Sequence, residues 1–228
     1  MDKVVVALDN FSKEDLKKFL GKYGSHFKTI KIGLELFNRY GRKYIEDISK
    51  KYDLEVFLDL KLHDIPSTVY KAIRSLEGLS IKFLTIHLSG GEEMIKNAMF
   101  ARDNYLPHTK LLGVTLLTSL NDEDVSTIYH SETEAAFSGL YHLAKKTRID
   151  GVVLSGHELS LARAIDHNYQ HNTLKVCPGI RFEGDESVDQ ARVMAPKDAF
   201  HNGANYLVIG RSITENPKVI DNIQEYLQ

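Results

Sequence analysis

Short apolar runs recur along the whole chain, and a longer amphipathic stretch separates each run from the next. The runs are rich in Val, Ile and Leu, as expected of strands that are buried on both faces. Eight of them are strand candidates, at residues 3–8, 28–32, 54–60, 81–87, 111–116, 151–154, 173–177 and 205–209. Strands that alternate with helical patterns form parallel sheets, and eight such strands are the number that closes a barrel.

The intervening stretches have the periodicity of amphipathic helices. They cover residues 12–23, 34–51, 66–78, 90–104, 134–147, 156–168 and 214–227. The first of them begins after Ser12, a good N-cap, with Glu14 and Asp15 in the first turn, where acidic side chains favour the helix dipole.

The least regular stretch is 178–198, which contains Pro178, Gly179, Gly184 and Pro196. In a barrel this stretch is the loop after strand seven, a place where lids and phosphate ligands often lie. No Pro-, Gly- or Ser-rich linker divides the chain. The pattern therefore predicts one domain over residues 1–228, an α/β fold of the (β/α)8 TIM-barrel type.

Bulk properties narrow the class of function. The 228 residues carry a formal net charge of −2, so no overall field favours nucleic acid, and an anion must be bound by a local site. Cys177 is the one cysteine, which excludes an intrachain disulfide and a cysteine-rich zinc site. No apolar stretch approaches the roughly 18 residues of a membrane span, and the run at 4–8 is too short for a signal peptide. We expect a cytoplasmic protein without a membrane or nucleic-acid partner.

Polar residues collect at the carboxyl ends of the predicted strands, where barrels of this type have their active sites. They are Asp9, Lys31, Asp59, Lys61, His87, Thr118, Arg181, Gly210 and Arg211. Within this group, Asp59 and Lys61 are two positions apart on one strand, so their side chains project to the same side, while Leu60 faces the helices. Carboxylates beside a lysine stabilise its ammonium form, which favours Lys61 as a proton donor. The alternative is a buried ion pair that only closes the barrel.

A second candidate is an anion site after the last strand, where Gly210 allows close backbone approach and Arg211 begins a helix. Arg181 and Gln190 from the preceding loop are available to the same site, which favours the anion-binding interpretation. A Gly-Arg pair also occurs where glycine simply ends a strand. Among the histidines, only His63 and His87 lie near the predicted mouth, where a supporting role is open. The others lack metal-ligand spacing and are expected on the surface: His26, His108, His130, His142, His157, His167, His171 and His201.

Several of these segments together resemble the orotidine 5′-phosphate decarboxylase family in order and spacing. The matching segments are Ala7–Asp9, Lys31–Gly33, Asp59–Pro66, Pro178–Arg181 and Ile209–Arg211. The resemblance covers essentially the whole chain, and the D-x-K-x-x-D-I-P block is its most specific part.

The resemblance implies decarboxylation of orotidine 5′-monophosphate to uridine 5′-monophosphate without a cofactor or metal, in pyrimidine biosynthesis. Lys61 would protonate carbon 6 of the pyrimidine, and Asp59 would lie beside the substrate carboxylate. Lys31, Asp59, Lys61 and Asp64 would form an alternating charge array, with Asp64 contributed across the interface of a homodimer.

The resemblance also implies the residues that bind the substrate. Asp9 and Lys31 would hold ribose hydroxyls, and Ile65 and Thr68 would approach from the partner subunit. Either Thr118 or Ser119 would hydrogen-bond the pyrimidine. The 5′-phosphate ligands would be Arg181, Gln190, Gly210 and Arg211, and phosphate binding would supply energy for closing the 178–198 loop.

Two other functions remain open. A metal-dependent relative on the same barrel acts on sugar phosphates and needs carboxylate ligands for magnesium, whereas this chain has Lys31, a cation, on strand two. A nucleotide-binding barrel without catalysis would keep the phosphate site. Retention of Asp59, Lys61 and Asp64 argues against it, because a buried charge array costs stability.

Overall fold

The computed structural model of the protein describes residues 2–182 and 194–223, and within them the chain forms a closed barrel of eight parallel strands. Each strand pairs with the next in sequence, and the barrel closes where β1 pairs with β8. The strands are β1 (Val4–Ala7), β2 (Thr29–Gly33), β3 (Glu55–Leu62), β4 (Ile81–His87), β5 (Lys110–Val114), β6 (Gly151–Val153), β7 (Leu174–Cys177) and β8 (Tyr206–Ile209). All eight predicted strands and the fold class are confirmed.

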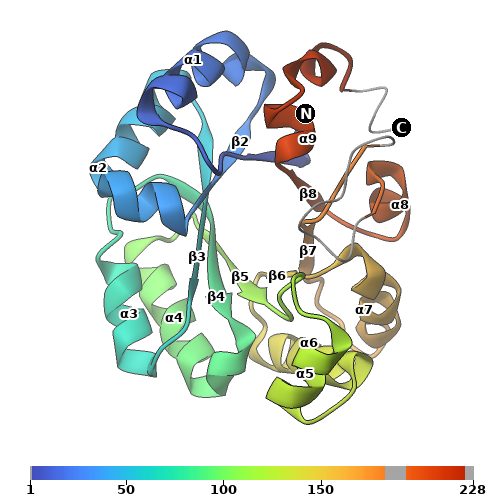
Figure 1. Cartoon of the computed structure of the whole chain (residues 1–228). Coiled ribbons are helices and arrows are strands. Elements are labelled where there is room, and N and C mark those ends of the chain that lie inside the picture. The colour runs from blue at the N-terminus through green and yellow to red at the C-terminus, as the bar shows by residue number, and fades with distance from the viewer. Residues whose placement is uncertain (1, 183–193, 224–228) are drawn as a thin grey trace.

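Helices surround the barrel, as Figure 1 shows in a view along its opening. They are α1 (Lys13–Tyr23), α2 (Leu34–Tyr52), α3 (Pro66–Arg74), α4 (Gly91–Tyr105), α5 (Asp122–Tyr129), α6 (Thr133–Thr147), α7 (Leu159–Asp166), α8 (Pro196–His201) and α9 (Arg211–Thr214). Short 3₁₀ turns are η1 (Gly24–His26), η2 (Leu88–Gly90), η3 (Gly156–Glu158) and η4 (Pro217–Asn222). No helix in the described ranges is long and apolar enough to cross a membrane.

Local sequence explains where several helices begin. The Ser12 hydroxyl accepts a hydrogen bond from the Asp15 N–H at 3.1 Å, so the predicted N-cap of α1 is confirmed. Pro66 and Pro196 occupy first-turn positions of α3 and α8, where a missing N–H costs nothing.

The structure differs from the predicted helices at three places. Of the helix predicted at 214–227, residues 224–227 lie outside the described part of the chain, and the described part is the end of the short α9 followed by η4, because Pro217 lacks an N–H and Asn216 lies outside the helical region. The stretch before α6 contains α5, which we had not predicted, opened by a capping box between Asn121 and Asp124. The predicted loop 178–198 ends in α8, and residues 183–193 lie outside the described part of the chain.

The apolar core has two layers, because strand side chains alternate between the barrel interior and the helices. Inward-facing residues fill the barrel centre: Val5, Ala7, Phe57, Phe83, Leu112, Val114, Val153, Val176 and Val208. Outward-facing residues such as Ile30, Leu58 and Leu84 pack under the helices and are fully buried. Each such side chain contributes about 1.5–3 kcal/mol by leaving water. A rigid floor of this kind holds the polar residues at the strand ends in place.

Candidate active site

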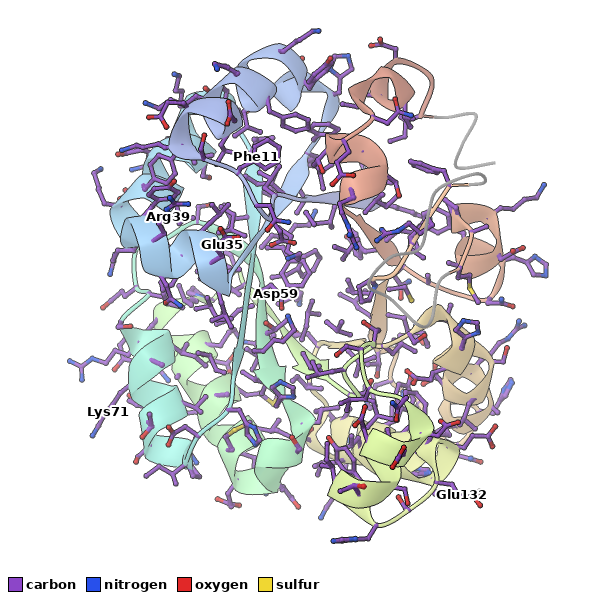
Figure 2. All side chains as sticks on the ribbon, viewed as in Figure 1. Phe11, Glu35, Arg39, Asp59, Lys71 and Glu132 are labelled. Carbon is purple, nitrogen blue, oxygen red and sulfur yellow. The ribbon has the colours of Figure 1, made fainter. Side chains whose placement is uncertain are left out.

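A cavity of about 330 Å³ opens at the carboxyl ends of the strands. Phe57, Val153 and Val208 from the inner core layer form apolar parts of its wall. The other lining residues are Ala7, Asp9, Asn10, Lys31, Asp59, Lys61, Thr118, Pro178, Gly179, Arg181, Gly210, Arg211 and Thr214. Figure 2 shows Asp59 near the centre of the ring of helices, whereas Lys71 and Glu132 lie at its outer edge. The polar residues predicted at the strand ends thus share one cavity.

Alternating charges cross this cavity from β1 to β3. The Lys31 ammonium lies 3.1 Å from Asp9 Oδ2 and 3.6 Å from Asp59 Oδ2. The Lys61 ammonium lies 2.7 Å from the same Asp59 oxygen. Asp59 therefore lies between two lysines, and Lys31 between two carboxylates.

Asp59 is almost completely buried, with 8% of its surface exposed. Burial by itself raises the pKa of this carboxyl group, but the charges of Lys61 and Lys31, with hydrogen bonds from Lys61 and Thr85, lower it more, so the net pKa is below its ordinary value. The carboxylate is consequently ionised at neutral pH.

The backbone of Lys61 has φ of 47°, in the left-handed region that side chains other than glycine rarely adopt. Such a conformation costs roughly 1–2 kcal/mol. It falls where the register between β3 and β4 shifts, from Leu58 opposite Leu84 to Leu62 opposite Ile86. Lys61, at this irregularity of β3, lines the cavity. Backbone strain of this kind is common at functional sites.

The absence of a side chain at Gly33 leaves space beside the charged groups of Asp9 and Lys31. A Cβ atom there would lie 3.0 Å from Asp9 Oδ1 and 3.5 Å from Lys31 Nζ. Gly33 thus leaves room for the Asp9–Lys31 ion pair beside the start of α2.

Two arginines also line the cavity: Arg181 follows β7, and Arg211 follows β8, the strand that pairs with β1. Gly179, with φ of 77°, and Gly210 line the wall between them. Two guanidinium groups beside glycine backbone form an arrangement suited to an anion such as a phosphate.

The structure brings together eight of the predicted site residues as cavity lining: Asp9, Lys31, Asp59, Lys61, Thr118, Arg181, Gly210 and Arg211. Ser119, the alternative to Thr118, is not among the lining residues. Asp64, Ile65 and Thr68 are exposed outside the cavity of their own chain, and Asp64 Oδ1 accepts the Ile65 N–H at 2.7 Å. Gln190 lies outside the described residues.

His63 and His87 contact each other rather than the cavity, with ring centroids 5.2 Å apart. Burial, with the nearby charges of His63 and Lys61, lowers the pKa of His87 to about 4. The remaining histidines are exposed, as predicted, except His171. That residue is half-buried, with its ring 3.4 Å from the Thr173 hydroxyl.

Sequence reasoning missed Asn10, Phe57, Thr85 and Thr214. Asn10, Phe57 and Thr214 line the cavity, while Thr85 lies beneath it and bonds both Asp59 and Lys61. Thr85 had a detectable signal, because it is a polar residue on the inward-facing alternation of a buried strand.

A family model described as "Orotidine 5'-phosphate decarboxylase / HUMPS family" matches residues 2–226. The chain belongs to this family. An orotidine 5′-phosphate decarboxylase of Fusobacterium nucleatum is 40% identical over 219 residues, covering 94% of this chain and 91% of that one. The enzyme of the same name from Ehrlichia chaffeensis is 42% identical over 200 residues, covering 87% of this chain and 84% of its own length.

Solved structures agree with the assignment to this family. The crystal structure of orotidine 5′-phosphate decarboxylase from Lactobacillus acidophilus superposes with a TM-score of 0.82 at 34% identity, with complete coverage of both chains. An enzyme from Methanocaldococcus jannaschii, complexed with the inhibitor BMP, has a TM-score of 0.77 at 22% identity, over 100% of this chain and 99% of that one, and supports the fold. The relatives that match the present chain over most of its length are orotidine 5′-phosphate decarboxylases. The protein is therefore an enzyme, a carboxy-lyase.

Proposed function

We propose that this enzyme decarboxylates orotidine 5′-monophosphate to uridine 5′-monophosphate in pyrimidine biosynthesis, without a cofactor, and that Lys61 is the proton donor. The observation that carries the proposal is the Lys61 ammonium in the cavity, 2.7 Å from the buried carboxylate of Asp59.

Decarboxylation without a cofactor needs a fixed positive charge beside carbon 6, the carbon that loses the carboxylate. When the bond between carbon 6 and the carboxylate breaks, carbon dioxide leaves and the electron pair stays on carbon 6. A cation held beside that carbon stabilises the developing negative charge, and a preorganised site is more effective at this than water. Lys61 then donates a proton to carbon 6 and is reprotonated from solvent. Asp59 both holds this ammonium and lies where the departing carboxylate would be repelled.

The two arginines support binding of the 5′-phosphate. Arg181 and Arg211 line the cavity after β7 and β8, two strands away or more from β3, which carries Lys61. A phosphate held there is remote from the reacting carbon, so its binding energy can be used to orient the pyrimidine against Lys61. Gln190, whose role rests on the family resemblance, would complete the phosphate site.

The remaining assignments follow from the same placement. Asp9 and Lys31 would bind the ribose hydroxyls, and Thr118 would bind the pyrimidine. Because Asp64, Ile65 and Thr68 are exposed outside the cavity of their own chain, they are available to a partner subunit. We therefore propose a homodimer with shared sites. Sedimentation at the assay concentration would give twice the mass of the monomer. The buried Cys177 fits a cytoplasmic enzyme.

The name of the family also covers a second activity, so a metal-dependent reaction on a sugar phosphate is the competing proposal. It would need carboxylates free to bind magnesium. Here the Lys31 ammonium lies between Asp9 and Asp59, at 3.1 Å and 3.6 Å, and would repel a divalent cation. This position of Lys31 favours decarboxylation.

The loss of ultraviolet absorbance on adding orotidine 5′-monophosphate, measured in excess EDTA, tests the function. We expect rapid conversion to uridine 5′-monophosphate at a rate that added magnesium does not change. The proposal is wrong if the nucleotide is stable and turnover begins only with magnesium and a sugar phosphate.

A further inference from the structure

The polar residue with the most unusual surroundings outside the cavity lining is Thr85, at an inward-facing position of β4. Its side chain is fully buried, with 0% of its surface exposed. A hydroxyl group has one proton to donate, and it can also accept hydrogen bonds. At Thr85 both functions are used, and both partners belong to the catalytic pair.

The first bond concerns the backbone of Lys61. Between Leu58 and Leu62 the register of β3 on β4 shifts, so the ordinary ladder of backbone bonds is interrupted there. The Lys61 N–H instead donates to Thr85 Oγ1 at 2.8 Å. The threonine side chain therefore takes the place of a backbone acceptor at the residue with left-handed φ.

The second bond concerns the carboxylate of Asp59. Thr85 Oγ1 donates to Asp59 Oδ1 at 2.9 Å, which leaves Asp59 Oδ2 for the Lys61 ammonium at 2.7 Å. A closed loop results: backbone of Lys61, hydroxyl of Thr85, carboxylate of Asp59, ammonium of Lys61. Each member restricts the orientation of the next, so the loop fixes both ends of the lysine relative to the carboxylate.

We propose that Thr85 is a positioning residue of the decarboxylase, whose hydroxyl holds the strained Lys61 backbone and the Asp59 carboxylate in register. The inference rests on the proposed role of Lys61. Thr85 does not line the cavity, so it acts through these two residues and makes no contribution to substrate binding.

The test is a set of variants at position 85. Thr85→Val keeps the shape of the side chain and removes both hydrogen bonds. A catalytic geometry that is off by about 1 Å costs about 100-fold in rate, so we expect kcat to fall by about that factor while KM changes by less than about threefold. Thr85→Ser retains the hydroxyl and should restore kcat to within about threefold of wild type.

A matched control is available at the other end of the barrel. Thr109 precedes β5, is 3% exposed, and its hydroxyl donates to the Ile81 carbonyl oxygen at 2.8 Å. Thr109→Val therefore removes a buried threonine hydrogen bond without touching the site, and we expect its kcat to match wild type. Equal kcat values in Thr85→Val and Thr109→Val would overturn the proposal.

Two further arms keep the result interpretable. If Thr85→Val does not fold, Thr85→Cys replaces it, since a thiol is a weaker donor and acceptor of similar size. Its kcat should then fall well below that of Thr85→Ser, and equal values would contradict the inference. Lys61→Ala is measured alongside: if it retains wild-type turnover, the proposed role of Lys61 has failed and with it the basis of this inference, and if the wild-type protein itself does not convert the nucleotide, the proposed reaction has failed. Inactivity of Lys61→Ala with normal Thr85→Val refutes only the role of Thr85.

Discussion

Two lysine–aspartate clusters in this barrel have similar composition and different surroundings. At the cavity, Asp59 lies between Lys31 and Lys61. At the other cluster, Asp166 at the end of α7 accepts from Lys145 at 2.8 Å and from Lys175 at 2.5 Å. Burial raises the pKa of each aspartate, and the paired lysines lower it more, so both carboxyl groups have a pKa below the ordinary value.

The clusters differ in how much hydrogen-bonding capacity the protein itself uses. The Lys145 ammonium donates to Asp166, to the His171 carbonyl oxygen and to the Thr173 hydroxyl, and none of its side chain is exposed. Within the described residues, the Lys61 ammonium donates to Asp59 only, and 33% of its side chain is exposed at the cavity. A perturbed carboxyl pKa therefore does not separate a structural pair from a functional one. The two kinds of pair are separated by whether the lysine has N–H donors that the protein does not use and that face a cavity.

The largest expected effect on stability is at the cluster of Lys145, Asp166 and Lys175, where the protein itself uses the hydrogen-bonding capacity of the Lys145 ammonium. Lys145→Met removes a fully buried ammonium and leaves three acceptors, Asp166, the His171 carbonyl oxygen and the buried Thr173 hydroxyl, each without this donor, so we expect a loss of about 3 kcal/mol or more. For a domain of this size that is about 6–12 °C in Tm, with kcat per folded molecule unchanged. Lys61→Met should lower kcat but change the free energy of unfolding by no more than about 1 kcal/mol. The Lys61 side chain is 33% exposed, and Asp59 keeps its contacts with Lys31 and Thr85. Thermal unfolding and turnover of both variants are the measurements. Similar losses of Tm in the two variants would contradict the view that the Lys145 cluster is structural and the Lys61–Asp59 pair is functional.

A smaller effect is expected at the arginines of the cavity. Arg211→Ala removes the proposed charge-assisted contact to the substrate phosphate, for which about 1.5–3 kcal/mol is expected, so kcat/KM should fall about 10- to 100-fold. Orotidine, which lacks the phosphate, should be converted equally slowly by the variant and by wild type. Arg163→Ala, an exposed arginine on α7, is the control. A loss on orotidine as large as on the nucleotide would mean that Arg211 supports the fold rather than the phosphate.

The smallest effect concerns pH. The pKa of His87 is about 4 in the fold, lowered by burial and by nearby positive charge, and about 6.5 in the unfolded chain. Between these values the unfolded state binds more protons, so His87 costs stability as pH falls from about 6.5 to about 4. His87→Gln should reduce the stability difference between pH 7 and pH 4.5 by about 1–2 kcal/mol in urea unfolding. His108→Gln, at an exposed position, should not. An unchanged difference in His87→Gln would mean that this histidine does not drive the acid sensitivity.

Strand alternation explains which parts of the site were predictable. It placed Asp59 and Lys61 on one face, and the common edge of a parallel barrel brought Asp9, Lys31 and Arg211 to the same end. The same alternation marks Thr85 as a polar residue of the barrel interior, but its bonds to Asp59 and Lys61 depend on a register shift, which no sequence periodicity encodes. Lys145 and Asp166 were missed because they meet through the packing of α6 against α7. Short elements such as α5 and α8 escaped because one or two turns give too little periodicity.

The central claim is that Lys61 is the proton donor, and the most direct test is the decarboxylation rate of Lys61→Ala beside Lys145→Ala, each normalised to the folded fraction. The account predicts that Lys61→Ala loses about 10⁴-fold or more in kcat. It should still bind uridine 5′-monophosphate and unfold at nearly the wild-type temperature. Lys145→Ala should be much less stable and fully active when folded. Turnover by folded Lys61→Ala close to that of wild type would contradict the account.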